Sequence, residues 1–452
     1  MKYDYDIAII GGGPGGYVAG SYASQFGKKV CVIEKGLIGG CCLNVGCIPT
    51  KSILETATRY QHATNSVKYG IKADVSFDWN EYRANSVKIR EELRNGVKRL
   101  LRSHRCDLIE GEASIISNNS IKVNDHNISA EKIIIATGSS PAIPDKYKEM
   151  NRVLTSDSFW EIDCRPKSIV IVGGGVIGCE IASALSRLGS KVTIVEQQSR
   201  LLMQFDTETV AILEKDLTNN GVDILYENSV TDIIEKNDEI IAIVDGQGPQ
   251  TISAEYLLWS TGRKPVIPAI SGISINTNEQ GYILTDDNCL TNVNTIYCIG
   301  DTNGKCMLAH AATAQAMNVV RHICIGNNAS DSTFVPQTVF TYPQIAELGV
   351  TEKECDCGSI AIGKIPYSSV GYSHIIDSTE GYYKIIRDIA TDRIVGAQIV
   401  GYNACELIHI LAPYINKPID ANMVQDMIFA HPTLSEGIKL AIEASYIRSP
   451  QA

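Results

Sequence analysis

Short runs of consecutive apolar residues, bounded by glycine or charged residues, recur along the chain and indicate buried strands. The clearest runs lie at 5–10, 30–34, 168–172 and 192–196. The first and third runs are each followed by clustered glycines and then by small and apolar residues over a helical length. Strand, glycine turn, helix and second strand make up the βαβ unit of parallel sheets, so the pattern predicts an α/β fold with two such units.

Later segments predict further elements. The runs 128–138 and 252–262 resemble each other as buried strands that end in Thr-Gly, and 295–301 reads as a strand that ends in Gly-Asp. The stretch 81–103 predicts a helix. The segments 382–387 and 394–400 are expected to form a hairpin with helical stretches after it, so the C-terminal part is expected to be α+β. Apolar or small positions on the predicted helix are Val87, Leu93, Val97, Leu100 and Leu101.

Both glycine clusters match G-x-G-x-x-G, and an acidic residue follows each cluster. The matching positions are Gly11, Gly13, Gly16 and Glu34 in the first unit and Gly173, Gly175, Gly178 and Glu196 in the second. In each unit, 18 positions separate the last glycine from the acid. Such glycines let the backbone approach a pyrophosphate at a helix N-terminus, and the acid accepts hydrogen bonds from a ribose. One such motif is as consistent with a plain glycine turn, but two at equal spacing predict two Rossmann-like dinucleotide-binding domains.

The two units differ in length. The glycine clusters are offset by 162 positions and the Thr-Gly strands by 124, so the first unit carries 38 additional residues. The additional length includes a pair of cysteines and the predicted helix at 81–103. The first unit is therefore expected to carry chemistry of its own, and the second to be a plainer binding domain.

Length and charge narrow the picture further. A chain of 452 residues is too long for one ordinary core. We expect a first dinucleotide-binding domain at 1–145, a second at 146–265, a central segment at 266–333 that completes the first, and a C-terminal domain at 334–452. The formal charge of −11 disfavours nucleic acid and anionic membrane surfaces as partners. No window has the roughly 20 apolar residues of a membrane helix. We expect a cytoplasmic protein, because residues 5–10 already read as a first strand with no signal peptide before it.

Cys42 and Cys47 stand apart from the other cysteines. Most of the 14 cysteines lie in strand or helix patterns and are expected to be buried thiols. This pair lies in Cys-Leu-Asn-Val-Gly-Cys-Ile-Pro, about one βαβ unit after Gly11. A bare C-x4-C is more often two inert cysteines, but beside a dinucleotide a thiol pair can exchange electrons with it. Together with the paired glycine units, the segment resembles the flavin-dependent disulfide reductases, the pyridine nucleotide-disulfide oxidoreductases. Within that family it is most similar to the dihydrolipoamide dehydrogenases.

The resemblance implies FAD in the first site and NAD in the second. The residues it implies for FAD are Gly11, Gly13, Pro14, Gly16, Glu34, Lys51, Thr137, Gly138, Asp301, Met307, Leu308, Ala309 and His310. Those it implies for NAD are Gly173, Gly175, Val176, Ile177, Gly178, Glu196 and Gly262. Asp301 would hold the ribityl chain of the flavin, although taken alone it reads rather as a cap of the next helix. The helix that starts near Met307 would point its N-terminus at the flavin's pyrimidine edge.

The second acid favours NAD over NADP. Glu196 would repel a 2′-phosphate, and the two residues after it are Gln197 and Gln198. The nearest basic residue is Arg200, whereas relatives that use NADPH carry basic residues in this stretch. Val176 stands where glutathione-type relatives carry a gating tyrosine, which fits an open nicotinamide site.

By the same resemblance, Cys47 would lie against the flavin and Cys42 would face the substrate. A helix N-terminus and a nearby positive group lower a thiol pKa, so we expect the thiolate to form near neutral pH. Lys51, one turn after Cys47, would be read alone as a solvated helix lysine. In the family it pairs with a glutamate, here Glu180, and approaches the flavin, where such a pair stabilises negative charge.

The segment His431-Pro432-Thr433-Leu434-Ser435-Glu436 has two compatible interpretations. Thr433 and Glu436 fit a capping box at the start of the last helix. The segment also resembles the family's catalytic His-Pro-Thr-x-x-Glu, in which His431 would be the acid and base and Glu436 would orient it. In the family this histidine comes from the partner subunit, and the part from about Phe334 forms the dimer interface, so a homodimer is expected.

The activity that the resemblance implies is oxidation of dihydrolipoamide, either free or carried by the lipoyl domain of a multienzyme complex. Electrons would pass through Cys42 and Cys47 and then FAD to NAD⁺, and no metal is expected. Three alternatives stay open: a reductase of another low-molecular-weight or protein disulfide, a flavin oxidase, and a flavin-bearing scaffold or redox sensor. Two departures from the family pattern have no assigned role. Cys41 stands where relatives usually carry a hydroxyl residue, and Cys355 and Cys357 form a close pair read as a surface turn.

Overall fold

The computed structural model describes residues 3–246, 248–326, 334–355, 358–415, 423 and 426–447. The chain divides into two compact units built from segments distant in sequence. The first unit comprises 1–53, 78–165 and 261–330, and the second comprises 54–77, 166–260 and 331–452. The four predicted domains were defined by the ligand or partner that each is expected to bind, whereas the two units are defined by compactness. The four-domain division therefore stays a prediction.

The first unit contains a parallel sheet with an antiparallel extension. Its parallel strands, in spatial order, are β3 (Asp107–Glu110), β2 (Val30–Glu34), β1 (Tyr5–Ile10), β6 (His126–Ile135) and β18 (Ile296–Cys298). Beyond the first half of β6 lie β5 (Ser120–Val123), β4 (Ala113–Ser117) and β17 (Ala269–Ile270). The strands β1, β2 and β18 and the C-terminal end of β6 are buried, as expected for a sheet covered on both faces, whereas the edge strand β3 is partly exposed.

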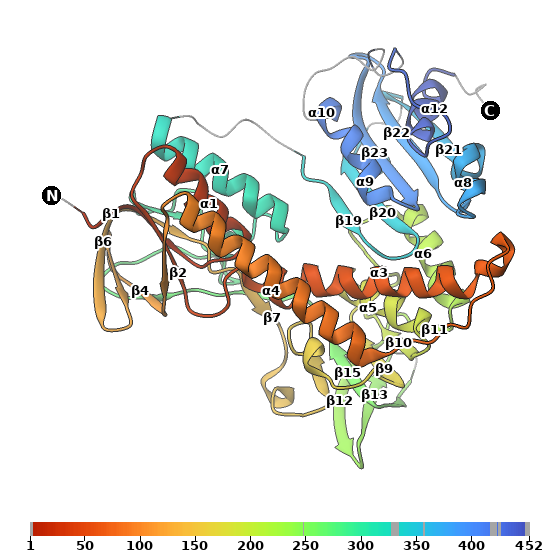
Figure 1. Cartoon of the computed structure of the whole chain (residues 1–452), viewed down its shortest axis with the longest axis horizontal. Coiled ribbons are helices and arrows are strands. Elements are labelled where there is room, and N and C mark those ends of the chain that lie inside the picture. The colour runs from red at the N-terminus through yellow and green to blue at the C-terminus, as the bar shows by residue number, and fades with distance from the viewer. Residues whose placement is uncertain are drawn as a thin grey trace. The chain divides into compact units, whose positions relative to one another are not determined.

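Helices cover this sheet and carry the cysteine segment. They are α1 (Pro14–Gln25), α2 (Gly40–Asn44), the start of α3 (Cys47–Thr64), α4 (Trp79–Ser103) and α7 (Ala309–Ile325). In Figure 1, α1 and α7 lie side by side over the strands of the unit. Pro14 opens α1, where its missing N–H leaves no unpaired donor. A two-stranded ribbon, β7 (Ser139–Pro141) with β16 (Arg263–Pro265), joins the 261–330 segment to the rest of the unit.

The second unit repeats this plan. Its parallel strands, in spatial order, are β11 (Val222–Leu225), β10 (Lys191–Val195), β9 (Ser168–Val172) and β15 (Tyr256–Trp259). The antiparallel meander consists of β12 (Ser229–Lys236), β13 (Glu239–Asp245) and β14 (Gln250–Ala254). The helices of this part are α5 (Val176–Arg187) and α6 (Thr207–Asn219). The run 252–262, expected as one strand, is two strands with a break at Glu255, whose carboxylate accepts from Lys167 N at 2.7 Å.

An antiparallel sheet ends the second unit. Its spatial order is β19 (Gln337–Val339), β20 (Gln344–Gly349), β23 (Arg393–Gly401), β22 (Tyr382–Asp388) and β21 (Ile360–Pro366). The predicted hairpin is the pair β22 and β23. One face of the sheet packs on α9 (Ala404–Leu407), α10 (Ala412–Ile415) and α12 (Glu436–Ala444), seen beside the sheet in Figure 1, and α8 (Gly371–Ile375) follows β21. The predicted α/β class, with two Rossmann-like sheets and an α+β C-terminal part, is confirmed.

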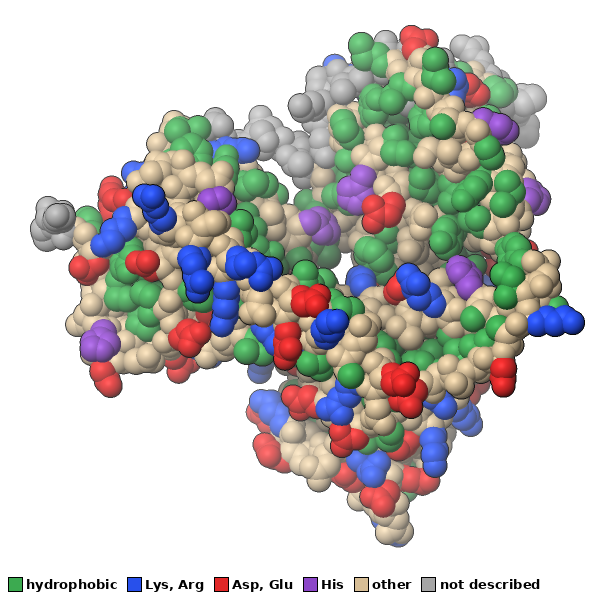
Figure 2. Space-filling model, in the orientation of Figure 1, with side chains coloured by type: hydrophobic (Ala, Val, Ile, Leu, Met, Phe, Trp, Pro, Cys, Tyr) green, Lys and Arg blue, Asp and Glu red, His purple; other side chains and the backbone are tan. Residues whose placement is uncertain are grey.

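Charge is unevenly distributed over the surface. On the face shown in Figure 2, Lys and Arg side chains gather over α1 and α4, although the whole chain carries a formal charge of −11. The exposed basic residues of α4 and the turn after it include Arg99, Arg102 and Arg105.

Among the described residues, no helix combines the length and apolar content needed to cross a bilayer.

Candidate active site

The glycine turn of the first unit leaves no room for side chains. Gly11 has a φ of +106°, and a Cβ there would stand 2.3 Å from the Ala136 carbonyl oxygen. A Cβ on Gly16 would stand 1.8 Å from the Gly11 carbonyl oxygen. Gly13, by contrast, precedes the first residue of α1, and the nearest atom to a Cβ there lies 3.9 Å away. The turn therefore brings bare backbone to a helix N-terminus and leaves space in front of it, which fits a pyrophosphate.

The second unit builds the same turn from Gly173, Gly175 and Gly178. Gly173 has a φ of +104°. A Cβ on Gly178 would stand 2.1 Å from the Gly173 carbonyl oxygen, and one on Gly175 would meet no atom within 4 Å. Val176 and Ile177 begin α5 directly after this turn. The equal spacing in sequence thus corresponds to equal steric geometry, and both cradles fit a dinucleotide.

The acid after each second strand faces its glycine turn in the same way. Glu34 accepts from Gly12 N at 2.7 Å and from Gly36 N at 2.7 Å. Glu196 accepts from Gly174 N at 2.6 Å and from Gln198 N at 2.8 Å. These bonds fix each carboxylate at the mouth of its turn, and a carboxylate keeps lone pairs with which to accept from ribose hydroxyls.

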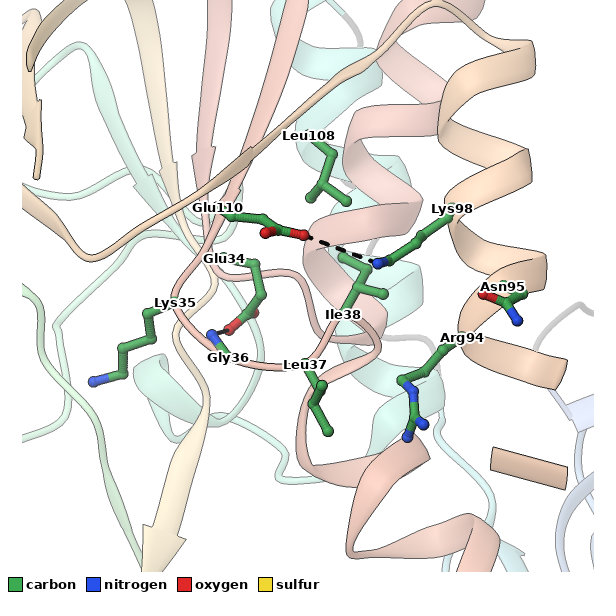
Figure 3. A pocket seen from close by; sticks show the side chains of 10 residues that line it. All are labelled: Glu34, Lys35, Gly36, Leu37, Ile38, Arg94, Asn95, Lys98, Leu108 and Glu110. Carbon is green, nitrogen blue, oxygen red and sulfur yellow. Dashed lines mark hydrogen bonds and ion pairs between the residues drawn. The ribbon is translucent and has the colours of Figure 1, made fainter. Parts of the chain in front are cut away.

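A pocket of about 240 Å³ opens beside Glu34 in the first unit. Figure 3 shows it between the end of β2, the following loop and α4, with an ion pair between Lys98 and Glu110 at 3.9 Å along one side. Its lining residues are Glu34, Lys35, Gly36, Leu37, Ile38, Arg94, Asn95, Lys98, Leu108 and Glu110. Its position next to the Glu34 carboxylate, with apolar and polar walls, would suit the adenosine end of FAD.

Asp301 lies at the other end of this site, after β18. Its Oδ2 accepts from the Ser139 hydroxyl at 2.5 Å. The next residue, Thr302, is linked through its hydroxyl to Thr137 Oγ1 at 3.2 Å and to the Gly138 carbonyl oxygen at 3.2 Å. The structure thus brings Thr137, Gly138 and Asp301 together. Asp301 lies in a short 3₁₀ turn, Gly300–Asn303, and it does not cap a following α-helix.

The helix predicted after Met307 begins at Ala309, with Leu308 as its N-cap residue. Met307 is exposed, and its sulfur accepts from the Tyr282 hydroxyl at 3.6 Å. His310 is exposed in the first turn. The contacts of these four residues with the flavin stay predictions.

Cys42 and Cys47 are free thiols that form a hydrogen bond with each other. Cys42 lies in α2, and Cys47 is the first residue of α3. The hydrogen bond to Cys47 and burial raise the pKa of Cys42, while Lys51 acts in the opposite direction. The expected lowering of the thiol pKa is therefore wrong for Cys42, because the bond to Cys47 and burial both favour its protonated form. The pKa of Tyr17 is also raised, by burial and then by both cysteines, which places its ring next to the pair.

Asn44 holds the cysteine segment in shape, a role that the sequence did not reveal. Its amide nitrogen donates to the carbonyl oxygens of Leu37, Ile38 and Gly40, at 2.8 Å for Gly40. Its amide oxygen accepts from Arg94 at 2.9 Å. The buried Trp160 adds a bond from its ring N–H to the Val45 carbonyl oxygen at 2.7 Å. The sequence signal for this role was a polar residue, Asn44, among the apolar residues between the two cysteines.

Arg263 is a second residue that sequence reasoning missed. Its guanidinium donates to Ser139 Oγ at 2.8 Å, Asp157 Oδ1 at 3.1 Å and Cys41 Sγ at 3.3 Å. Ser139 also donates to Asp301, so one hydrogen-bond network joins the Cys41 thiol to Asp301, the residue predicted to contact the flavin. Burial raises the pKa of Cys41 to about 12, with Arg263 opposing the shift.

Lys51 and Glu180 belong to different compact units, so their pairing stays a prediction. Lys51 is half-buried on α3. Glu180 is buried on α5, and its Oε1 accepts from Phe340 N at 2.9 Å. Gly262, expected at the NAD site, lies in the first unit and the other predicted NAD residues lie in the second, so its place there also stays a prediction.

His431 and Glu436 are in contact, as the resemblance to the family's motif implies. His431 Nδ1 and Glu436 Oε1 are 2.9 Å apart, and the histidine side chain is 78% exposed. Glu436 Oε2 accepts from Thr433 N at 2.8 Å. This bond and then the one to His431 lower the pKa of Glu436. Only half of the expected capping box forms, because the Thr433 hydroxyl donates to the Ala430 carbonyl oxygen and α12 begins at Glu436 itself.

Comparison with known proteins identifies the family. The model described as pyridine nucleotide-disulphide oxidoreductase matches residues 5–316, and that of the family's dimerisation domain matches 335–442. The chain belongs to the pyridine nucleotide-disulphide oxidoreductases. It is therefore an enzyme, an oxidoreductase whose cofactors are FAD and NAD(H).

Individual members of the family extend the comparison. The dihydrolipoyl dehydrogenase of Geobacillus stearothermophilus is 33% identical over 452 residues, which cover 98% of this chain and 96% of that protein. The HOCl-induced flavoprotein disulfide reductase RclA of Escherichia coli has a TM-score of 0.87 and 26% identity, over 98% of this chain and 100% of that one. LpdA of Mycobacterium tuberculosis shares the fold, with a TM-score of 0.91 and 24% identity, over 97% of this chain and 98% of that one. Of the two cysteines read as a surface turn, Cys355 is described and Cys357 lies outside the described residues, so that interpretation stays a prediction.

Proposed function

We propose that this oxidoreductase oxidises dihydrolipoamide, with NAD⁺ as the final acceptor. The observation that supports the proposal most is the hydrogen-bonded pair of thiols formed by Cys42 of α2 and Cys47 at the start of α3, in the same unit as the first glycine turn. The 33% identity to dihydrolipoyl dehydrogenase over nearly the whole chain supports the choice of substrate.

The exchange begins with the Cys42–Cys47 disulfide in the oxidised enzyme. One substrate thiol loses its proton to His431, and the thiolate attacks Cys42 Sγ. The sulfur–sulfur bond breaks and Cys47 leaves as a thiolate. The second substrate thiol then attacks the substrate sulfur of the mixed disulfide, its proton passing to the departing Cys42 sulfur, so that a cyclic disulfide and the Cys42 thiol are released. The substrate has lost two electrons and the cysteine pair has gained them.

Glu436 prepares the histidine for this step. The contact at 2.9 Å fixes the orientation of the ring and stabilises its protonated form. The bond from Thr433 N keeps Glu436 ionised, since the pKa of Glu436 is lowered. The exposed His431 side chain is accessible to a substrate thiol.

Bound FAD would accept the two electrons from the dithiol and pass them to NAD⁺ as a hydride. Glu34 and the first glycine turn would hold its adenosine and pyrophosphate, and Asp301 its ribityl chain. Lys51 with Glu180 would supply positive charge and its counterion near the flavin ring. Glu196 would hold the ribose of NAD.

The proposed enzyme is a homodimer in which His431 of one chain serves Cys42 of the other. The match of 335–442 to the family's dimerisation domain supports this arrangement. The substrate is carried by a lipoyl domain of a multienzyme complex or is free dihydrolipoamide.

Anaerobic reduction with dihydrolipoamide, followed by visible spectroscopy, tests the proposal. A long-wavelength thiolate-to-flavin band in wild type that is missing in Cys47→Ser, with NADH formed on adding NAD⁺, is expected. A flavin that NADH reduces but dihydrolipoamide leaves oxidised would refute the substrate assignment.

A second candidate is a reductase that uses NADH to reduce another disulfide. The structural likeness to RclA, a disulfide reductase, favours keeping it. It shares the cysteine pair and both nucleotide cradles, so only substrate comparison separates the two. NADH oxidation with glutathione disulfide and with protein disulfides, set against lipoamide, would decide between them.

A further inference from the structure

One face of α5 carries three buried polar residues. Glu180, Ser183 and Arg187 are spaced by three and four positions, so they lie along the same face of the helix. All three are buried, with Ser183 fully inaccessible. Buried polar groups must find partners, and these side chains find theirs largely in one short segment, residues 340–342, which follows β19.

The contacts of the α5 face with that segment run in register. Glu180 Oε1 accepts from Phe340 N at 2.9 Å, and Ser183 Oγ accepts from Tyr342 N at 3.2 Å. Arg187 donates to the Tyr342 carbonyl oxygen at 3.0 Å. The Arg187 guanidinium also lies over the Tyr342 ring, 5.1 Å from its centroid. The segment is thus held at both ends by the same helix.

Arg187 is the most heavily bonded side chain of this junction. Besides Tyr342, it donates to Gln61 Oε1 at 3.0 Å, to the Ser183 carbonyl oxygen at 3.1 Å and to Ser183 Oγ at 3.0 Å. Its charge is balanced by Asp216 at 2.5 Å, with both side chains nearly inaccessible. Gln61 lies on α3, the helix that also carries Cys47 and Lys51. A planar guanidinium with five donors suits such a junction, where an ammonium could serve only part of it.

We propose that Arg187 is a positioning residue for Glu180. By fixing the backbone of 340–342, it holds the Phe340 N–H that donates to the Glu180 carboxylate, and so sets the direction of that carboxylate. The inference rests on the proposed role of Glu180 beside the flavin. It extends that role to a residue seven positions further along α5 that contacts neither cofactor nor substrate in the proposed mechanism.

Hydrogen exchange of the holoenzyme tests the structural half of the proposal. In Arg187→Gln, the Phe340 amide should exchange about tenfold faster or more, because the 340–342 backbone that carries this N–H is no longer held against α5. Arg387→Gln is the matched control. Arg387 is equally buried and donates to Ser445 at 3.2 Å and 3.0 Å and to Asp392 at 2.6 Å, with no contact to α5. It should leave exchange at Phe340 within about twofold of wild type.

A double-mutant cycle tests the functional half. Flavin reduction by NADH, followed in a stopped-flow instrument, should slow by about tenfold or more in Arg187→Gln. In the Glu180→Gln background, the same change should cost less than about twofold, because the residue being positioned is already altered. Arg187→Lys, which keeps the charge and one donor towards Tyr342, should restore part of the rate. Ser183→Ala provides a milder variant if Arg187→Gln does not fold, with the same direction expected in both readouts.

Additive effects in the cycle would overturn the proposal, as would unchanged exchange at Phe340 or an equal loss of rate in Arg387→Gln. A Glu180→Gln variant that reduces its flavin as fast as wild type would also overturn it, since there would be nothing to position. These measurements use NADH as the reductant and no dithiol. Failure of the proposed dihydrolipoamide activity would therefore appear separately, as a flavin that NADH reduces and dihydrolipoamide does not.

Discussion

Glu347 should make the second unit less stable as the pH rises. It lies on β20, 7% exposed, where its Oε1 accepts from Asp206 N at 3.1 Å. The buried Lys384 is the nearest cation of this face, but its ammonium is already shared by Glu352, Asp206 at 3.9 Å and Glu208 at 4.0 Å. Between Glu347 and Lys384 in the strand register lies Gln398, whose side-chain N and O have no hydrogen-bond partner among the described residues. Burial therefore dominates and raises the pKa of Glu347 to about 7.

The sign and size of the effect follow from this shift. Because the ordinary value is 4.5, the folded chain binds the Glu347 proton more tightly than the unfolded chain does. Stability is then lost as the pH rises from 4.5 through about 7, and it is constant above that range. At about 1.4 kcal/mol for each unit, the ionised carboxylate costs the fold roughly 3 kcal/mol at pH 8.

Glu347→Gln should abolish this loss. The amide has the shape of the protonated acid, and its oxygen can still accept from Asp206 N. Thermal unfolding of the holoenzyme at pH 5 and pH 8 is the assay. The variant should match wild type at the lower pH and melt roughly 5 °C higher or more at the upper one, since a unit of this size shifts by about 2–4 °C for each kcal/mol.

Glu208→Gln is the control, because it removes a negative charge from the same cluster at a half-exposed position. It should show no comparable gain at pH 8. A Glu347→Gln variant less stable than wild type at pH 8 would refute the reasoning. It would mean that the attraction of the ionised Glu347 carboxylate to Lys384 outweighs the cost of its burial.

Three further substitutions test the candidate site. Gly16→Ala should lose bound FAD, because the added Cβ would stand 1.8 Å from a carbonyl oxygen; the measurement is flavin absorbance per chain. The control Gly371→Ala should retain FAD, because a Cβ there meets no atom within 4 Å. Asn44→Ala should lower the free energy of unfolding by about 3 kcal/mol, because it leaves buried donors and acceptors unpaired. The same variant should slow flavin reduction by dithiol but not by NADH. His431→Gln should slow dithiol oxidation by about a hundredfold or more while NADH-ferricyanide activity persists; equal loss of both would contradict its proposed role.

The sequence predicted best those parts that rest on local patterns. The strand at 5–10 was placed at its observed bounds because an unbroken apolar run leaves no other way to bury it. The equal spacing of Gly16 to Glu34 and Gly178 to Glu196 corresponded to matching hydrogen bonds, because that spacing is set by one turn of backbone. The contact of His431 with Glu436 was also predicted, because the segment that contains both residues resembles a family motif.

Patterns failed where tertiary packing decides. On α4, Leu93 and Val87 were expected among the apolar positions of the helix, but they are 41% and 37% exposed, and the buried face runs through Trp79, Tyr82, Val97 and Leu101. The junction around Arg187 could not be predicted at all. Its partners Gln61 and Tyr342 lie 126 and 155 positions away, and an arginine on a helix gives no sign of which distant backbone it will contact.

The packing also explains how three cysteines can lie within seven residues without interfering. Cys41 and Cys42 are adjacent, yet their sulfurs occupy different surroundings: that of Cys42 bonds to Cys47, and that of Cys41 lies 3.3 Å from Arg263 and 3.8 Å from Asp157. Only a thiolate attacks a disulfide, and with a pKa of about 12 Cys41 stays protonated at neutral pH. Its contacts are those of a hydroxyl group, donating to a carboxylate and accepting from a guanidinium. A thiol in this position therefore makes the contacts that a hydroxyl residue would make there, and under the proposed function the electron exchange would be left to Cys42 and Cys47.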